Sequence, residues 1–249
     1  MIELLSAGNY PIKYSIKKIA RIGGILYFVI IVAGFLGEMF VRGKLVVSGD
    51  VAATATNIMQ SPLLWRIGIA GDLVMHVCDV PLMVIFYLLL RPVNKYLALT
   101  ALVFNVVQTA VLAINKLNLL TPLFVLGGAD YMKVFDTGQL QALSYLSIKY
   151  HGYGFGIGLI FFGFTAIILG YLIIRSGYIP KFIGILMQIA GLCYVVNSFI
   201  LIINPGLSDK LYPWILLLPL IAELSLCLFM IFKGVNITKW QEKIISVMG

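Results

Sequence analysis

The sequence predicts an all-α fold: a polytopic transmembrane helical bundle of about six spanning helices, with both termini in the cytoplasm. Three observations support this prediction. Hydrophobic residues make up 61% of the 249 residues. Charged residues make up only 11%, whereas soluble domains carry about a quarter. The apolar residues also gather in long runs, and most lysines and arginines fall between those runs.

Each apolar run is long enough to form a spanning helix, because about 20 apolar residues cross the hydrocarbon core of a membrane. Helices are expected because lipid offers the backbone no hydrogen-bonding partner. The first run follows basic residues, as in a signal peptide, but it is longer than a usual signal core, so we expect it to be retained. In order, the runs cover residues 22–41, 64–90, 96–125, 143–174, 182–203 and 214–233.

The polar segments between the runs define the predicted domains and topology. We expect a cytoplasmic N-terminal segment over 1–21, a single transmembrane domain over 22–234 and a cytoplasmic tail over 235–249. Eleven lysines and arginines fall on the side of both termini and seven on the other, which predicts that the first side is cytoplasmic. The loops expected outside are 42–63, with a short amphipathic helix capped near Asp50, 126–142 and 204–213.

Charge and cysteine content narrow the classes of function. The net charge is +8, but the basic residues do not form a patch with interleaved aromatic residues. We therefore expect contacts with membrane lipids and no nucleic-acid partner. Cys78, Cys193 and Cys227 each lie inside an apolar run without a CxxC pair, which gives no support to a disulfide scaffold or a zinc ribbon.

Glycines mark the faces on which two of the helices are expected to pack closely. They recur every seven residues in the fourth run and again in the fifth. Small residues at such a spacing let membrane helices approach one another. The glycines are Gly156, Gly163, Gly170, Gly184 and Gly191.

The second run carries ionisable residues that lipid does not tolerate easily. Asp72, His76 and Asp79 follow one another at spacings of four and three, which places them on one face of a helix. This face should be turned into the bundle, because intramembrane charges face the protein interior or water. The same stripe is extended by Trp65, Gly68, Met83 and Phe86.

Other runs add polar residues at similar depths. The 1.5 Å rise per helical residue lets them meet in one layer between the midplane and the outer surface. We therefore expect a buried polar cavity in the outer half of the bundle, opening outward. Glu38 and Lys116 lie near helix ends, where snorkelling explains them. The polar residues are Asn105, Gln108 and Asn115 in the third run, Ser144, Ser147 and His151 in the fourth, Gln188 and Asn197 in the fifth, and Glu223 in the sixth.

These polar residues favour binding or conduction of a small polar or cationic ligand, an ion or a proton. Intramembrane carboxylates indicate function by default, whereas single Asn or Gln residues more often bridge helices. No reacting group can be assigned. The candidate ligand-binding or ion-binding residues are Asp72, His76, Asp79, Asn105, Gln108, Asn115, His151, Asn197 and Glu223.

Two alternatives stay open. The first is an intramembrane zinc hydrolase acting on a lipid-like amide or ester, with His76, His151, Asp72 and Asp79 as metal ligands. Ser147 and His151 resemble the SxxxH element of the ceramidase and adiponectin-receptor superfamily, but its HxxxH element is absent. The second alternative is a structural or sensory membrane subunit, and a homo-oligomer is compatible with each reading.

Several short motifs resemble a known family. They include NKLN at 115–118, HGYG at 151–154 and SGYIP at 176–180. In this order they resemble the bacterial membrane family called domain of unknown function 4386, over roughly residues 19–236. The resemblance implies a multi-pass protein of the bacterial plasma (inner) membrane and implies no reaction. The other matching segments are 71–95, 135–141, 170–172, 223–226 and 233–236.

Overall fold

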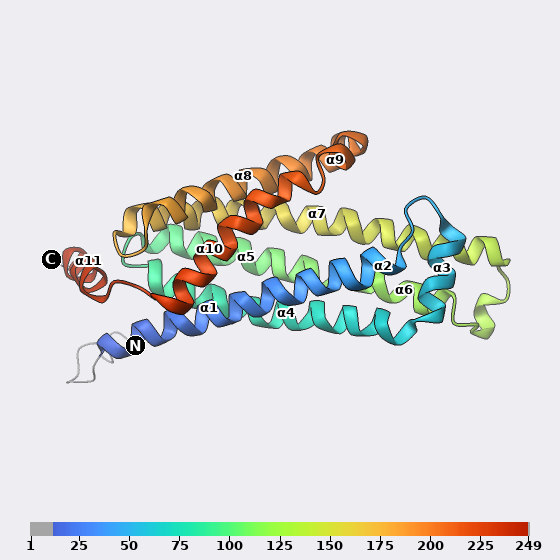
Figure 1. Cartoon of the computed structure of the whole chain (residues 1–249), viewed down its shortest axis with the longest axis horizontal. Helices are drawn as coiled ribbons and strands as arrows, with labels where there is room; N and C mark the ends of the chain where they lie inside the picture. The colour runs from blue at the N-terminus through green and yellow to red at the C-terminus, as the bar shows by residue number, and fades with distance from the viewer. Residues whose placement is uncertain (1–11, 249) are drawn as a thin grey trace.

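The computed structural model, which describes residues 12–248, is a bundle of long helices (Figure 1). The predicted all-α membrane bundle is confirmed, because the described residues contain no strand and six helical segments are long and apolar enough to span a membrane. The protein is therefore a multi-pass membrane protein. The six spans are Ile16–Leu45, Pro62–Leu90, Lys95–Val125, Thr137–Ser176, Lys181–Ile203 and Trp214–Phe232.

Two of the spans are built from more than one helical segment. The first joins α1 (Ile12–Leu36), the π-helix η2 (Gly37–Arg42) and α2 (Gly43–Leu45). The third joins α5 (Lys95–Asn115) and α6 (Leu117–Val125), which meet at Lys116. Both irregular points lie beside buried charged residues, described below.

The remaining helices complete the bundle and its ends. The other long helices are α4 (Pro62–Leu90), α7 (Thr137–Ser176), α8 (Lys181–Ile203) and α10 (Leu217–Phe232). Short segments connect them: α3 (Val51–Gln60), η3 (Asp130–Met132), α9 (Pro205–Leu211) and η4 (Trp214–Leu216). The short helix expected near Asp50 is confirmed as α3, since the Asp50 Oδ1 atom accepts from the Ala53 amide at 2.9 Å.

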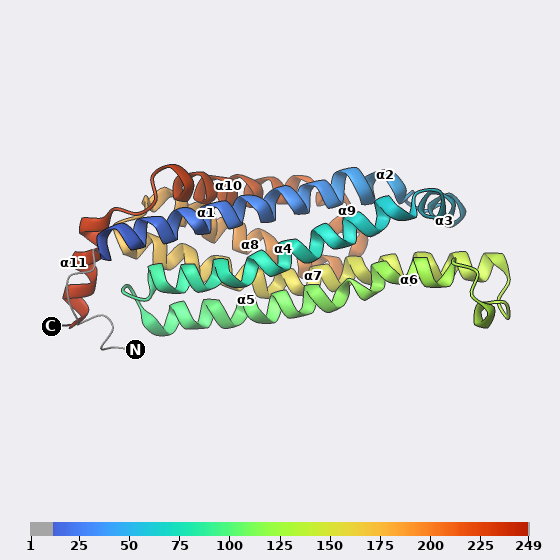
Figure 2. The same cartoon turned by 90° about the horizontal axis from the view of Figure 1, so that it is seen from below.

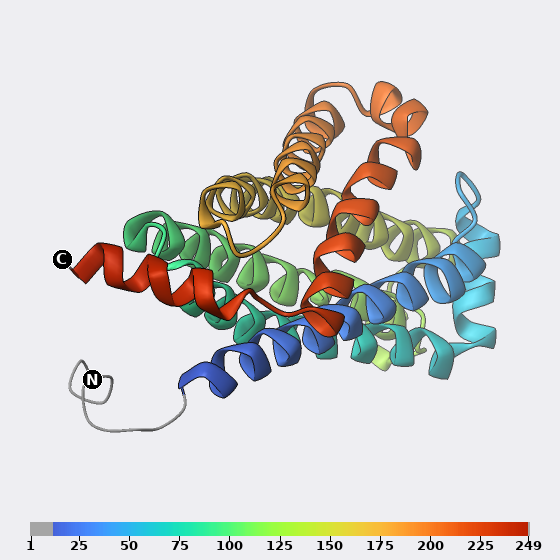
Figure 3. The same ribbon diagram turned by 60° about the vertical axis from the view of Figure 1, so that its left-hand side comes forward.

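The six long helices form a ring, in which α1, α4, α5, α7, α8 and α10 each pack against the next and α10 returns to α1. Both described ends of the chain lie at one end of this bundle, where α11 (Ile237–Met248) crosses the bundle axis (Figures 2 and 3). We call this the α11 end and the opposite one the α3 end. Assignment of the α11 end to the cytoplasm stays a prediction.

Helix α7 has 40 residues, or about 60 Å, whereas the hydrocarbon core of a membrane is about 30 Å thick. It begins at Thr137, before the predicted run at 143, because Asp136 and Gln139 form a capping box at its first turn. Its first turns project past the start of α4 at the α3 end, alongside α6 (Figure 2).

The predicted glycine faces are confirmed between α7 and α8. A Cβ atom added to Gly170 would lie 2.5 Å from the Gly184 carbonyl oxygen, and one added to Gly191 would lie 2.5 Å from the Gly163 carbonyl oxygen. The two backbones thus touch at these positions, and no larger residue fits there.

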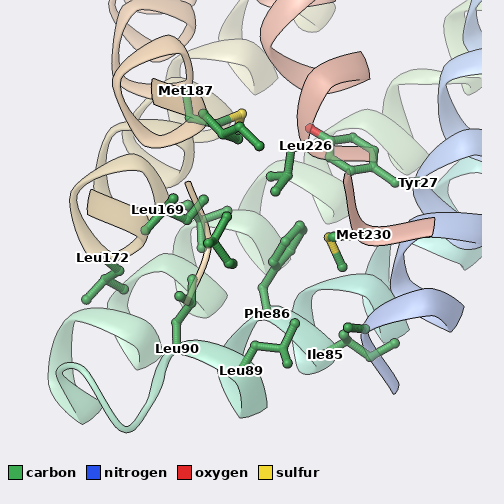
Figure 4. Close-up of a cluster of buried hydrophobic side chains, with 14 of the residues drawn as sticks. Tyr27, Ile85, Phe86, Leu89, Leu90, Leu169, Leu172, Met187, Leu226 and Met230 are labelled. Atoms are coloured by element: carbon green, nitrogen blue, oxygen red, sulfur yellow. The ribbon is translucent and has the colours of Figure 1, made fainter. Parts of the chain in front are cut away.

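The half of the bundle nearest the α11 end is filled with apolar side chains. Phe86 and Leu89 of α4, Leu172 of α7 and Met230 of α10 meet there with residues of α1 and α8 (Figure 4). Trp240 of α11 covers this core and donates from Nε1 to the Leu89 carbonyl at 3.2 Å. Consequently, the polar residues of the interior lie nearer the middle and the α3 end.

Candidate functional site

The predicted polar face of α4 is buried as expected. Asp72, His76 and Asp79 are each at most 7% exposed, and Trp65, Gly68, Met83 and Phe86 are buried with them. The other predicted candidates are buried as well, except Glu223, which is half-buried. Burial follows from the helical spacing; a role in ligand binding stays a prediction.

Two cations converge on Asp72. Its Oδ2 atom lies 2.8 Å from Arg42 Nη1 and 2.8 Å from Lys116 Nζ. The exposed fractions of the three side chains are 1% for Asp72, 4% for Lys116 and 14% for Arg42. The Lys116 ammonium also lies 3.3 Å from His151 Nε2. We call Asp72, Arg42, Lys116, His151 and Glu38 the ionic cluster.

The positions of Lys116 and Arg42 correct two expectations. Lys116 was expected to snorkel to the surface, but the junction between α5 and α6 turns it inward onto Asp72. Arg42 was expected in an outer loop, but the first span continues to Leu45 and carries Arg42 inside it. Only Glu38, 53% exposed, points outward, and it accepts from Arg42 Nε at 2.7 Å.

A glycine in the π-helix η2 makes room for the ionic cluster. A Cβ atom on Gly37 would lie 2.7 Å from Asp72 Oδ1 and 3.2 Å from Arg42 Nη2. The π-helix widens the turn that carries Arg42, and such insertions are frequent at functional sites. The sequence between 37 and 42 thus brings Arg42 against α4.

A second group of polar residues lies deeper in the bundle. Asp79 Oδ2 accepts from the Thr109 hydroxyl at 2.5 Å, and Asn105 Nδ2 lies 3.5 Å from Asp79 Oδ1. Glu223 Oε1 on α10 accepts from the Tyr194 hydroxyl on α8 at 2.5 Å. We call Asp79, Thr109, Asn105, Glu223 and Tyr194 the mid-bundle acid group.

Among the described residues, the acids of this second group have no basic partner. In the part of the chain that the structure describes, no ion pair involves Asp79 or Glu223. Their neighbours supply only hydroxyl and amide hydrogen bonds. Thr109 and Tyr194 were missed by sequence reasoning, since hydroxyl residues are common in membrane helices and no spacing singles them out.

The two groups form two layers, and this corrects the expectation of a single layer. Along α4, Asp79 lies about 16 Å from Leu90 and Asp72 about 27 Å. Glu223 lies about 14 Å from Phe232 along α10. The acid group is therefore nearer the middle of the bundle, and the ionic cluster is nearer the α3 end.

Of the three amide candidates outside these two groups, one joins two helices. Asn115 donates from Nδ2 to the His151 carbonyl at 2.9 Å, which ties the end of α5 to α7. Gln108 accepts from Asn105 within α5. Asn197 is buried, and its Oδ1 atom has no hydrogen-bond partner within residues 12–248. Asn115 thus has the packing role between helices that single amides usually have.

The buried polar side chains do not line either of two surface pockets in the described part of the chain. Two surface pockets lie elsewhere, one beside α11 with Ser176 and Lys239, and one near the start of α7 with Phe135 and Leu143. The predicted outward-opening cavity is not one of these pockets.

The geometry of the donors does not support the zinc alternative. Within residues 12–248, no group of three His, Cys, Asp or Glu side chains is placed to hold a metal ion. The Lys116 ammonium contacts both Asp72 and His151, where a zinc ion would have to lie. Asp79 is bonded to Thr109 instead.

Comparisons with known proteins identify a family for the chain but no activity. A family model described as "Domain of unknown function (DUF4386)" matches residues 22–234. No curated protein and no solved structure matches the chain. The resemblance predicted from the order of short motifs is therefore confirmed.

Proposed function

The chain belongs to the family described as Domain of unknown function (DUF4386), and from the geometry of its buried groups we propose that it reversibly binds a proton, or a small cation in its place, at Asp79 and Glu223. The observation that supports this proposal most directly is the lack of a basic partner for these two carboxylates in the described chain. Asp72, by contrast, is neutralised by Arg42 and Lys116.

An ionised carboxylate without a counter-ion is very costly in a low-dielectric interior, so such a group is neutralised by a proton or by a cation. Hydroxyl and amide donors such as Thr109, Asn105 and Tyr194 can bond to either form of the acid. They hold the carboxylates in place without supplying positive charge. The positive charge that neutralises them must then come from a proton or a cation in solution.

The two acids lie on helices that both pack against α1. Asp79 is on α4 and Glu223 is on α10, and α1 lies between these helices. Two negative charges in one apolar interior repel each other, so the pair favours holding at least one proton or cation. Loss of that proton or cation would push α4 and α10 apart, which couples binding to helix packing.

Access is expected from the α3 end. The α11 half is filled by the apolar core that includes Phe86 and Leu89. On the other side, Asp72, His76 and Asp79 follow one another along the buried face of α4. His76 lies about 6 Å along the helix axis from Asp72 and about 4.5 Å from Asp79, so it can pass a proton between the two levels.

Infrared difference spectroscopy of the protein in lipid nanodiscs tests the proposal. The carboxyl C=O stretch of a protonated acid should change reversibly with pH in the wild type. In the pH range where exposed carboxylates stay ionised, Asp79→Asn and Glu223→Gln should each remove part of this signal. Asp130→Asn, whose side chain is 93% exposed, should leave the signal in that range intact.

Binding of small monovalent cations should suppress the same signal. No signal that depends on Asp79 or Glu223 at any pH, together with no binding of cations, would contradict the proposal. That result would favour a structural or sensory role.

A further inference from the structure

Side chains of α5 place several oxygen atoms beside the Asp79 carboxylate. Asn105, Gln108 and Thr109 follow one another at spacings of three and one, which places them on one face of the helix. All three side chains are buried, and each carries a hydroxyl or amide oxygen that can bind a cation. Among the described residues, Asp79 therefore has neutral oxygen-bearing neighbours and no basic one.

The amide oxygen of Asn105 lacks a hydrogen-bond donor. Thr109 has a single hydroxyl hydrogen, and it is donated to Asp79 Oδ2 at 2.5 Å. Asn105 Oδ1 lies 3.5 Å from the same hydroxyl oxygen and receives no second hydrogen from it. No other donor among the described residues reaches this oxygen, and Asn105 is 0% exposed. Buried polar atoms without partners are rare, and a bound cation would give this oxygen a partner.

The spacing of the oxygen atoms fits one small ion. Asn105 Oδ1 and Thr109 Oγ1, 3.5 Å apart, can both lie about 2.5 Å from an ion between them, a distance typical of Ca²⁺. Asp79 Oδ2 is next to the same hydroxyl oxygen, so oxygen atoms of three side chains converge there. A bound cation would replace the hydrogen bond between Thr109 and Asp79. The hydroxyl hydrogen would then turn to the Asn105 backbone carbonyl, one helical turn earlier.

The charge of this cluster selects a monovalent ion. One carboxylate is neutralised by one positive charge, whereas a divalent ion would leave an uncompensated charge in a low-dielectric interior. Ligands that are all oxygen atoms suit hard cations. Na⁺ combines a size close to that of Ca²⁺ with a single charge. Glu223 offers a poorer site, because the hydrogen bond to its carboxylate comes from Tyr194 alone among the described residues.

Resting on the function proposed above, we propose that the small cation of the mid-bundle acid group is Na⁺. The Asp79 carboxylate, the Thr109 hydroxyl and the Asn105 amide oxygen bind it. Of the two acids, Asp79 is thus the one that takes the ion. Na⁺ and a proton exclude each other there, because both neutralise the same carboxylate.

Equilibrium binding of radioactive Na⁺ to the purified full-length protein in nanodiscs tests the proposal. We expect about one Na⁺ per chain, since one carboxylate is neutralised. The larger ion K⁺ should compete at least about tenfold more weakly. Asp79→Asn keeps the size of the side chain and should abolish binding.

Two threonines of the bundle provide a matched pair of variants. Thr109→Val should weaken Na⁺ binding at least about tenfold, because a ligand of the ion is lost, and Thr109→Ser, which keeps the hydroxyl, should retain it. Thr165 is also buried, and its hydroxyl bonds to the Ala101 carbonyl at 3.3 Å. Thr165→Val should leave the affinity for Na⁺ unchanged. Circular dichroism of each variant checks that the helices are intact.

The infrared signal of Asp79 distinguishes the failure of the sodium site from the failure of the proposed function. A carboxyl signal that depends on pH and on Asp79, without Na⁺ binding in the wild type, would overturn the sodium site and leave proton binding in place. Equal Na⁺ binding by the wild type, Asp79→Asn and Thr109→Val would also overturn it, because the ion would then lie elsewhere. Loss of both the infrared signal and Na⁺ binding in the wild type would overturn both proposals.

Discussion

Removal of Asp72 should destabilise the bundle far more than removal of either of its partners. Asp72→Ala leaves Lys116, only 4% exposed, facing His151 without a counter-ion. Breaking a buried ion pair in this way costs about 3–5 kcal/mol. Lys116→Met should cost only about 1–2 kcal/mol, because Asp72 keeps Arg42 at 2.8 Å.

The free energy of unfolding can be measured by titration with sodium dodecyl sulfate in mixed micelles, with helix content followed by circular dichroism. The double variant Asp72→Ala/Lys116→Met should cost less than the sum of the two single variants, by roughly 1–3 kcal/mol, because the stranded charge is removed with its partner. Asp130→Ala serves as the control, since its pair with Lys133 is on the surface and exposed pairs contribute little. Asp72→Ala at wild-type stability, or strict additivity in the double variant, would show that the cluster is not a buried ionic unit.

Three further changes test other parts of the structure. Gly184→Ala should lower the free energy of unfolding by about 1–3 kcal/mol through overpacking, because its Cβ would lie 2.6 Å from the Gly170 carbonyl oxygen. Gly152→Ala, where the added Cβ has open space, should be neutral in the same titration. Thr109→Val removes the hydroxyl that bonds to Asp79 at 2.5 Å. It should lower the free energy of unfolding by about 1–3 kcal/mol and shift the infrared signal of the Asp79 carboxyl. An unchanged signal would argue against the contact. Trp240→Ala should release α11 from the bundle, since Trp240 is 6% exposed and its indole is bonded to the Leu89 carbonyl. Limited proteolysis should then cleave the C-terminal segment faster than in the wild type. Equal cleavage rates would refute the release.

The spans and their inward faces could be predicted because they depend on local patterns. Hydropathy marks each span, since every span must be apolar over the thickness of the membrane. The spacing of Asp72, His76 and Asp79 fixes their common face, since a helix repeats every 3.6 residues. The glycines that join α7 to α8 could be predicted for the same reason, because their regular spacing places them on one face of each helix.

The partners of these residues could not be predicted, because they come from other helices. Lys116 looked like a charge at a helix end, and only the junction between α5 and α6 turns it onto Asp72. Arg42 lies beyond the apolar run, so hydropathy assigned it to a loop. Thr109 and Tyr194 are ordinary residues of membrane helices, and only tertiary packing brings their hydroxyls to the two acids.

The central claim is that Asp79 and Glu223 exchange protons or small cations with solution. The most direct test is a potentiometric titration of the wild type and of the double variant Asp79→Asn/Glu223→Gln in identical nanodiscs, because the surface groups then cancel in the difference. We expect the wild type to take up between about one and two more protons per chain as the pH falls, with fewer taken up at high concentrations of a small monovalent cation. Titration curves that coincide at every pH and cation concentration would contradict the claim.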